Sequence, residues 1–253
     1  MGLPLHLFVL IATLAYVVVG LAVGIRLLRL ARRTGAFPEL ALGLAECLLA
    51  GAVPPLFIVA QVVSEPEALV RGAAFVGHLA YTVGCAVMIL FTWRVFRPGA
   101  RWARALVFAA IGVLGAGGVL GMLRTLLAPD LAALRDPQTT AFLVMEWVSL
   151  VGFFWTAGEA FHLHGRLRKQ RALGLADPVV VNRVLLWGVV GLGGVAAAGA
   201  PVVASLLGAS VSTHVPTRLV CALATVASSV AIQLAFLPPA SYLRWVRAHP
   251  QPA

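Results

Sequence analysis

Long apolar runs alternate with short polar segments along the whole chain, and this pattern predicts the fold. A helix needs about 20 apolar residues to cross the hydrocarbon core of a bilayer. Seven runs reach that length, approximately residues 4–28, 38–63, 69–95, 102–127, 140–165, 181–208 and 214–243. They are too long for barrel strands, so each is expected to be a helix. We predict an all-α polytopic membrane protein with seven transmembrane helices in one domain, residues 1–253, and no soluble domain.

The composition agrees with a membrane location. Hydrophobic residues make up 61% of the chain and charged residues 11%, whereas soluble domains are about half apolar and a quarter charged. The net charge of +10 comes from short basic clusters between the apolar runs, so we expect no nucleic-acid partner. The dominance of Arg over Lys, with abundant Ala, Gly and Leu, suggests a GC-rich bacterial genome. We therefore expect a multi-pass protein of the bacterial inner membrane, surrounded by membrane lipids.

The basic residues also predict an orientation. If the chain crosses the membrane seven times, 15 of its 19 Lys and Arg residues fall on one side. The other four are Arg71, Arg124, Arg135 and Arg218. The positive-inside rule then places the N-terminus outside and the C-terminus in the cytoplasm. The basic cytoplasmic loops are candidate surfaces for a cytoplasmic partner.

Polar residues at similar depths on different helices form a candidate outer pocket. Its predicted ligand-binding residues are Glu146, His78, Arg124, Arg218, Gln61 and Trp147. With a rise of 1.5 Å per residue, Glu146 lies roughly 10 Å below the outer surface, and His78 lies at a similar or slightly greater depth. Such a pocket would bind the polar or anionic head group of a small amphipathic molecule. The alternative is that the two arginines reach up to lipid head groups, while Glu146 is neutral or paired.

A second polar cluster is predicted nearer the cytoplasm. Its members are Glu46, Glu159, Gln233, His162 and Asn182. Two acids at one depth could share a proton, bind a cation or act as general acid and base. The alternative is a structural role, in which Glu159 meets His162 or Arg166 along its own helix.

No motif assigns a catalytic residue, a cofactor or a metal. The chain has no HExxH or CxxC, although His78, His214 and Glu146 on three helices are a conceivable zinc site. Lys169, the only lysine, is expected in a loop, which argues against a retinal Schiff base. Gly117 and Gly121 form a GxxxG pattern, which is typical either of close packing within the bundle or of a homodimer face.

Seven helices, short loops and an outside N-terminus resemble the layout of rhodopsins and G-protein-coupled receptors. The resemblance is one of topology, because the third helix ends in FTWRVFRP and the last in FLPPASYLRW, without DRY-type or NPxxY-type signatures. It implies a receptor-like or sensor protein that binds a small amphipathic or lipid-like ligand. The alternatives are a small-solute or proton-coupled transporter, suggested by a weak repeat of helices one to three in five to seven, and a membrane-embedded hydrolase.

Overall fold

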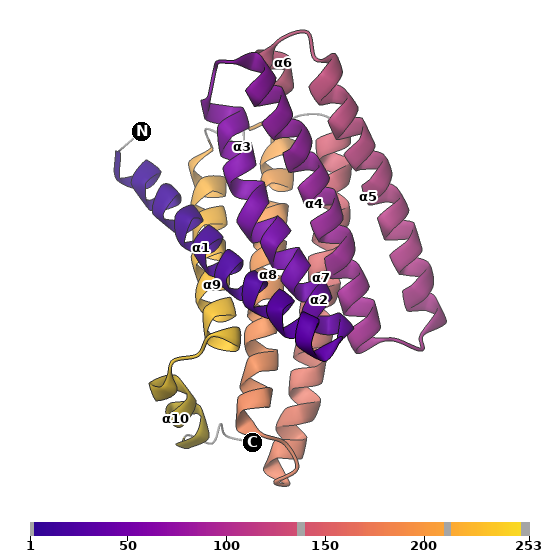
Figure 1. Ribbon diagram of the computed structural model, residues 1–253, viewed down its shortest axis with the longest axis vertical. Coiled ribbons are helices and arrows are strands. Elements are labelled where there is room, and N and C mark those ends of the chain that lie inside the picture. The colour runs from indigo at the N-terminus through magenta and orange to yellow at the C-terminus, as the bar shows by residue number, and fades with distance from the viewer. Residues whose placement is uncertain (1–2, 136–139, 210–213, 249–253) are drawn as a thin grey trace.

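The computed structural model describes residues 3–135, 140–209 and 214–248, which fold into helices joined by short connections (Figure 1). In chain order these are α1 (Leu3–Thr34), α2 (Phe37–Glu46), the π-helical segment η1 (Cys47–Ala52), α3 (Val53–Val62), α4 (Glu67–Phe96), α5 (Arg101–Leu127), α6 (Leu131–Arg135), α7 (Thr140–Ala172), α8 (Pro178–Leu206), α9 (Val215–Phe236) and α10 (Ala240–Ala248). Because α2, η1 and α3 follow one another directly, they form one long helix. The described residues contain no strand, which confirms the all-α prediction for that part of the chain.

The long helices close into a ring. Each packs against its neighbours in the sequence, and α1 packs against α9. α4 also contacts α7 directly, and α5 packs against both of them. α5 therefore stands outside a ring made of α1, α2–α3, α4, α7, α8 and α9 (Figure 1).

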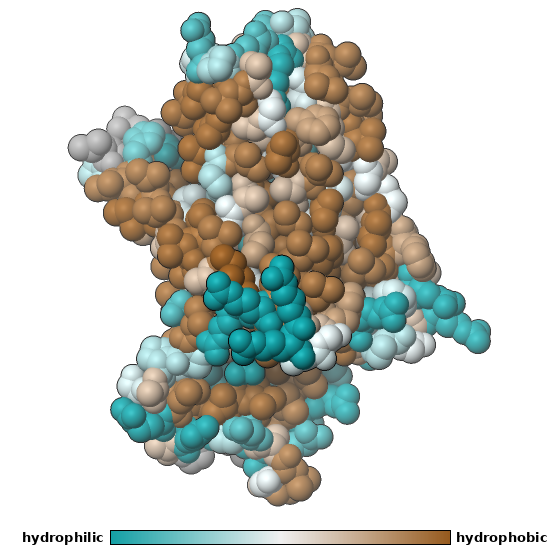
Figure 2. All heavy atoms as spheres, viewed as in Figure 1, coloured by the Kyte–Doolittle hydropathy of each residue, from teal (hydrophilic) through white to brown (hydrophobic). Residues whose placement is uncertain are grey.

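The surface and the helix lengths are those of a helical, apolar, membrane-like protein with several candidate membrane-spanning helices. Among the described residues, six helices are long and apolar enough to cross a bilayer, namely α1, α2–α3, α4, α5, α8 and α9. Figure 2 shows hydrophobic side chains over most of the flank, with hydrophilic atoms gathered at the upper end and in the lower part. That α7 also crosses the membrane, and that the N-terminus lies outside, stay predictions.

Prolines alter two of the predicted spans. Pro54 and Pro55 have no N–H to donate to the carbonyls four residues before them. The helix widens into η1 just ahead of these prolines, and the N–H of Val53 bonds to the carbonyl of Leu48 instead. The predicted last span, 214–243, is wrong at its end, because α9 stops at Phe236 and α10 is a separate helix beyond Pro238–Pro239.

Small residues let the helices approach closely. A Cβ added at Gly191 of α8 would lie 2.9 Å from the backbone of Ala157 on α7, so only glycine fits there. Gly117 and Gly121 of α5 face Met145 of α7 and His78 of α4. The GxxxG pattern therefore serves packing within the chain, one of its two predicted uses.

Candidate functional site

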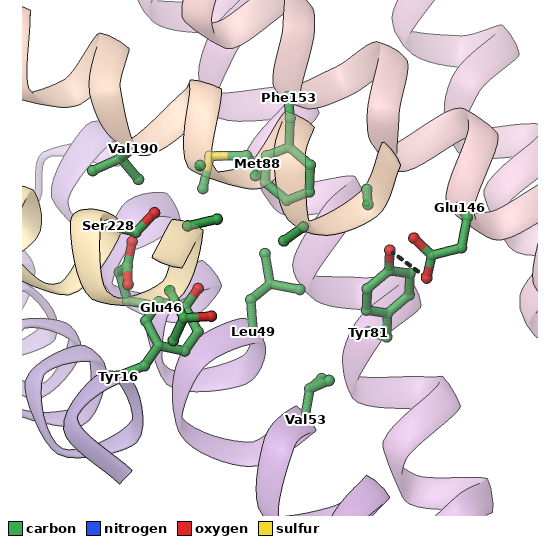
Figure 3. Close-up of a pocket in the computed structure, with 16 residues that line it drawn as sticks. Tyr16, Glu46, Leu49, Val53, Tyr81, Met88, Glu146, Phe153, Val190 and Ser228 are labelled. Carbon is green, nitrogen blue, oxygen red and sulfur yellow. Dashed lines mark hydrogen bonds between the residues drawn. The ribbon is translucent and has the colours of Figure 1, made fainter. Parts of the chain in front are cut away.

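A cavity of about 190 Å³ lies between the six helices of the ring (Figure 3). It is lined by Tyr16 of α1, Glu46 of α2, Leu49 of η1, Val53 of α3, Tyr81 and Met88 of α4, Glu146 and Phe153 of α7, Val190, Gly193, Gly194, Ala197 and Ala198 of α8, and Ala224, Thr225 and Ser228 of α9. α5 contributes no residue to this lining, as its place outside the ring requires.

The lining residues recur at helical spacing and give the cavity its length. Tyr81 and Met88 are seven residues apart on α4, as are Glu146 and Phe153 on α7, and seven residues cover about 10 Å of helix. The α2–α3 helix runs opposite to α4, to which a short connection joins it (Figure 1). Glu46, the first lining residue on that helix, therefore lies toward the end of the cavity away from Glu146, as Figure 3 shows.

Glu46 is a buried carboxylate with spare bonding capacity. Its exposed fraction is 4%, and its Oε2 atom has no hydrogen-bond partner. It is the last residue before the π-helical segment η1. Such turns often occur at functional sites. In the close-up, Tyr16 and Ser228 lie at the same end of the cavity as Glu46 (Figure 3).

The other polar end is built on Tyr81 and Glu146. The Tyr81 hydroxyl lies 2.7 Å from Ser149 Oγ and 3.3 Å from Glu146 Oε1. A phenol has one proton to donate, and the shorter contact with Ser149 is the better hydrogen bond. The Ser149 hydroxyl in turn donates to the backbone carbonyl of Glu146. The Tyr81 hydroxyl is therefore held beside Glu146, whose carboxylate keeps acceptor capacity toward the cavity.

The middle of the cavity is apolar and its α8 wall is made of small residues. Leu49, Met88 and Phe153 lie between the two polar ends (Figure 3). A Cβ added at Gly194 would lie 2.5 Å from the Phe153 ring, so the absence of a side chain there leaves room for the ring. None of the 16 described lining residues is Lys, Arg or His, so the acids are the charge-bearing groups that face this space.

Of the residues predicted for the outer pocket, Glu146 is the one among the described lining residues of the cavity. Glu146 lines the cavity, but His78 bonds the carbonyl of its own helix at Ala74 over 2.8 Å. The His78 ring also packs edge-on against Phe57 at 5.3 Å. Gln61 and Trp147 lie on the exposed surface.

The four predicted outer arginines contact backbone or histidine groups at the helix ends. Arg71 donates to the carbonyls of Thr125 and Ala128, both at 2.8 Å. Arg135 donates to the carbonyl of Ala60 and Arg124 to that of Ala133. Arg218 lies 3.0 Å from His6 Nδ1. Helix ends leave carbonyls without intrahelical donors, and arginine side chains bond several of them here.

The predicted inner cluster is also divided. Glu46 lines the cavity, whereas Glu159 accepts a hydrogen bond of 2.7 Å from Arg97 Nε, with which it forms an ion pair. Glu159 also accepts from Trp155 Nε1 at 3.2 Å. Glu159 therefore bonds Arg97 and Trp155. The predicted structural role had instead paired it with His162 or Arg166 of its own helix.

The remaining members of that cluster have local partners or face outward. The Asn182 amide donates to the Tyr242 hydroxyl of α10 at 2.9 Å. The Gln233 amide donates to the Leu237 carbonyl, next to the end of α9. His162 is exposed. None of the three lines the cavity.

Sequence reasoning missed the hydroxyl groups of the cavity. Tyr16, Tyr81, Thr225 and Ser228 line it, and all four lie inside apolar runs. The signal was weak, because Ser and Thr are common in membrane helices, where they bond their own backbone. Tyr16 and Tyr81 were the better clue, since a tyrosine deep in an apolar run needs a partner for its hydroxyl.

No three or more His, Cys, Asp or Glu side chains in the described residues are grouped as metal ligands would be. The chain matches no known protein-family model, and no curated protein or solved structure is significantly similar to it. The site must therefore be interpreted from its own chemistry.

Proposed function

We propose that this is a receptor-like or sensor protein with seven membrane-crossing helices, which binds a small amphipathic molecule in its central cavity. The observation that carries the proposal is the cavity itself, which has a polar group at each end and apolar side chains between them. Binding pockets are typically apolar with a few placed polar groups. An amphipathic molecule matches that distribution, with its polar group at one end and its body against Met88 and Phe153.

The size of the cavity limits the ligand. A protein cavity of roughly 150 Å³ accommodates benzene, and this one measures about 190 Å³. A ring-sized body with a short polar extension fits, whereas a whole lipid does not. The proposal therefore favours the small amphipathic ligand over the lipid-like one, and the central cavity over a pocket at the outer surface.

The outward face of α7 supports its crossing of the membrane. Trp147, Val151 and Phe154 are 48%, 50% and 67% exposed and follow one another at spacings of four and three residues, on one face of the helix. A stripe of large apolar side chains facing outward suits lipid better than water. Seven crossings then place the N-terminus outside and the C-terminus in the cytoplasm.

The test is saturable binding of a neutral probe of the right size, 2-phenylethanol, to the purified protein in lipid nanodiscs. We expect binding that is lost in Ala197→Phe, which fills the cavity from α8, and kept in Leu192→Phe. Leu192 is the matched control because it is 48% exposed on the same helix. Binding that does not saturate, or that is equal in both variants, contradicts the proposal.

A proton-coupled transporter is the second candidate. It is favoured by the presence of Glu46 and Glu146 on one cavity, with neither acid in an ion pair within the described residues. Membrane-embedded acids of this kind carry protons in many transporters. In vesicles loaded with a pH-sensitive dye, a transporter would change the internal pH on addition of its solute, and a sensor would not.

A further inference from the structure

We infer that the ligand of the central cavity is a small organic cation, an amine with an apolar body, whose ammonium group binds Glu46. This inference rests on the proposed function, and it names the chemical class of the molecule bound. Glu46 is 4% exposed with its Oε2 atom unpartnered, and its side chain lines the end of the cavity that Tyr16 and Ser228 also line (Figure 3).

The first argument is electrostatic. An ionised carboxylate inside a membrane protein is costly unless a cation or hydrogen bonds compensate it. The described lining supplies two carboxylates and no basic side chain, so the cavity lacks the positive charge that would pair with them. A bound ammonium group supplies that charge, whereas an anionic head group would meet only further negative charge.

The second argument concerns which of the two acids binds the ammonium. Glu146 already has the Tyr81 hydroxyl 3.3 Å from its Oε1 atom. Glu46 has no such partner at Oε2. An ammonium group has three donors, which Glu46 and the neighbouring hydroxyls of Tyr16 and Ser228 match in number. Tyr81 and Glu146 are left to meet a polar substituent at the far end of the ligand.

The third argument concerns the body of the ligand. Met88 and Phe153 lie between the acids, and four of the five α8 residues that line the cavity are glycine or alanine. A flat apolar group fits against these glycines and alanines, with Val190 as the larger α8 residue of the lining, and Met sulfur and aromatic edges are favourable neighbours of a ring. An inorganic cation would gain nothing from this surface, which favours an organic cation over a metal ion.

The test compares 2-phenylethylamine with 2-phenylethanol, which has nearly the same shape and no charge. Charge-assisted hydrogen bonds predict that the amine binds about ten- to a hundredfold more tightly at neutral pH. We expect Glu46→Gln to remove most of this preference. Leu192→Phe, at a residue that is 48% exposed and does not line the cavity, is the control and should keep the preference in full. Glu146→Gln removes the charge at the other end of the cavity and should reduce the preference less than Glu46→Gln does.

The outcomes separate the two proposals. If the alcohol binds saturably and the amine binds no better, the inference of a cation is overturned and the proposed cavity function stands. If the preference is present but depends on Glu146 and not on Glu46, the assignment of the ammonium site is overturned. If neither probe binds in a way that Ala197→Phe abolishes, the proposed function itself fails.

Discussion

Two buried glutamates, Glu159 and Glu46, have the same side chain and different roles. Glu159 is 8% exposed and paired with Arg97, so its negative charge is compensated within the protein. Glu46 is buried as deeply, but its Oε2 atom is unpartnered. A buried polar atom without a partner reduces stability, and replacing it with an apolar group of similar shape is often neutral or stabilising. Such a residue is therefore better explained by binding than by folding.

At Glu46 we predict that Glu46→Met raises the stability of the empty protein by about 1 kcal/mol. The unpartnered oxygen is removed, and a thioether of similar length fills the same space. The measurement is thermal unfolding of the purified protein, followed with a thiol-reactive dye. Glu159→Met is the comparison and should lower the melting temperature, because it takes the acceptor from Arg97 and Trp155. A lower melting temperature in Glu46→Met would show that this acid contributes to folding.

At the scale of the element, the close contact of α7 with α8 positions the cavity wall. Gly191 allows the backbones to meet at Ala157, and three residues later Gly194 admits the Phe153 ring. The α2–α3 helix contributes in a different way. Its π-helical segment lies between Glu46 and the two prolines, so the helix widens where its lining residues begin.

For α8 we predict that Gly191→Ala destabilises the protein by about 1–3 kcal/mol, the usual cost of overpacking. The added Cβ would lie 2.9 Å from the Ala157 backbone, which cannot move without shifting α7. Gly112→Ala on α5 is the matched control, because nothing lies within 4 Å of the added Cβ, and helix propensity alone predicts a gain of up to about 1 kcal/mol. Thermal unfolding of the two variants tests the contrast. Equal melting temperatures would contradict close packing at this contact.

At the scale of the whole molecule, the ring of six helices with α5 outside explains why the cavity draws on every helix of the ring. It also explains why polar residues from both halves of the bundle meet there. The apolar core of a bilayer is about 30 Å thick. If one acid lies roughly 10 Å from its outer boundary and the other roughly 10 Å from its inner boundary, about 10 Å separates the two along the membrane normal. A cavity two helical turns long bridges that gap.

The seven-crossing topology predicts the accessibility of two sites on either side of α7. Ala132 of α6 and Leu173 after α7 are both exposed, and the crossing of α7 would place them on opposite faces of the membrane. With Cys47, Cys85 and Cys221 replaced by alanine, a membrane-impermeant thiol reagent should label Ala132→Cys in intact cells. Leu173→Cys should require permeabilised cells. Labelling of both from the same side would show that α7 does not cross.

The sequence by itself determined the features that depend on local hydrophobicity. Long apolar runs can only satisfy their backbone in lipid as helices, so the all-α, multi-pass class and most helix positions followed from the pattern. α8 begins at Pro178, and proline is favoured at the first position of a helix. Asp177 precedes it, and its side chain accepts a hydrogen bond from the Val179 N–H. The end of the last span, 214–243, was predicted wrongly because apolar residues continue past Pro238 and Pro239. The helical hydrogen bonds cannot continue there, since proline has no N–H to donate.

Only the tertiary structure decided which polar residues meet. Depth along a helix can be counted from the sequence, but rotation about the helix axis and the choice of neighbours depend on packing. Depth alone therefore grouped Glu146 with His78, and Glu46 with Glu159. In the folded ring, Glu46 and Glu146 instead line the same cavity. Glu159 pairs with Arg97, and the His78 ring packs against Phe57.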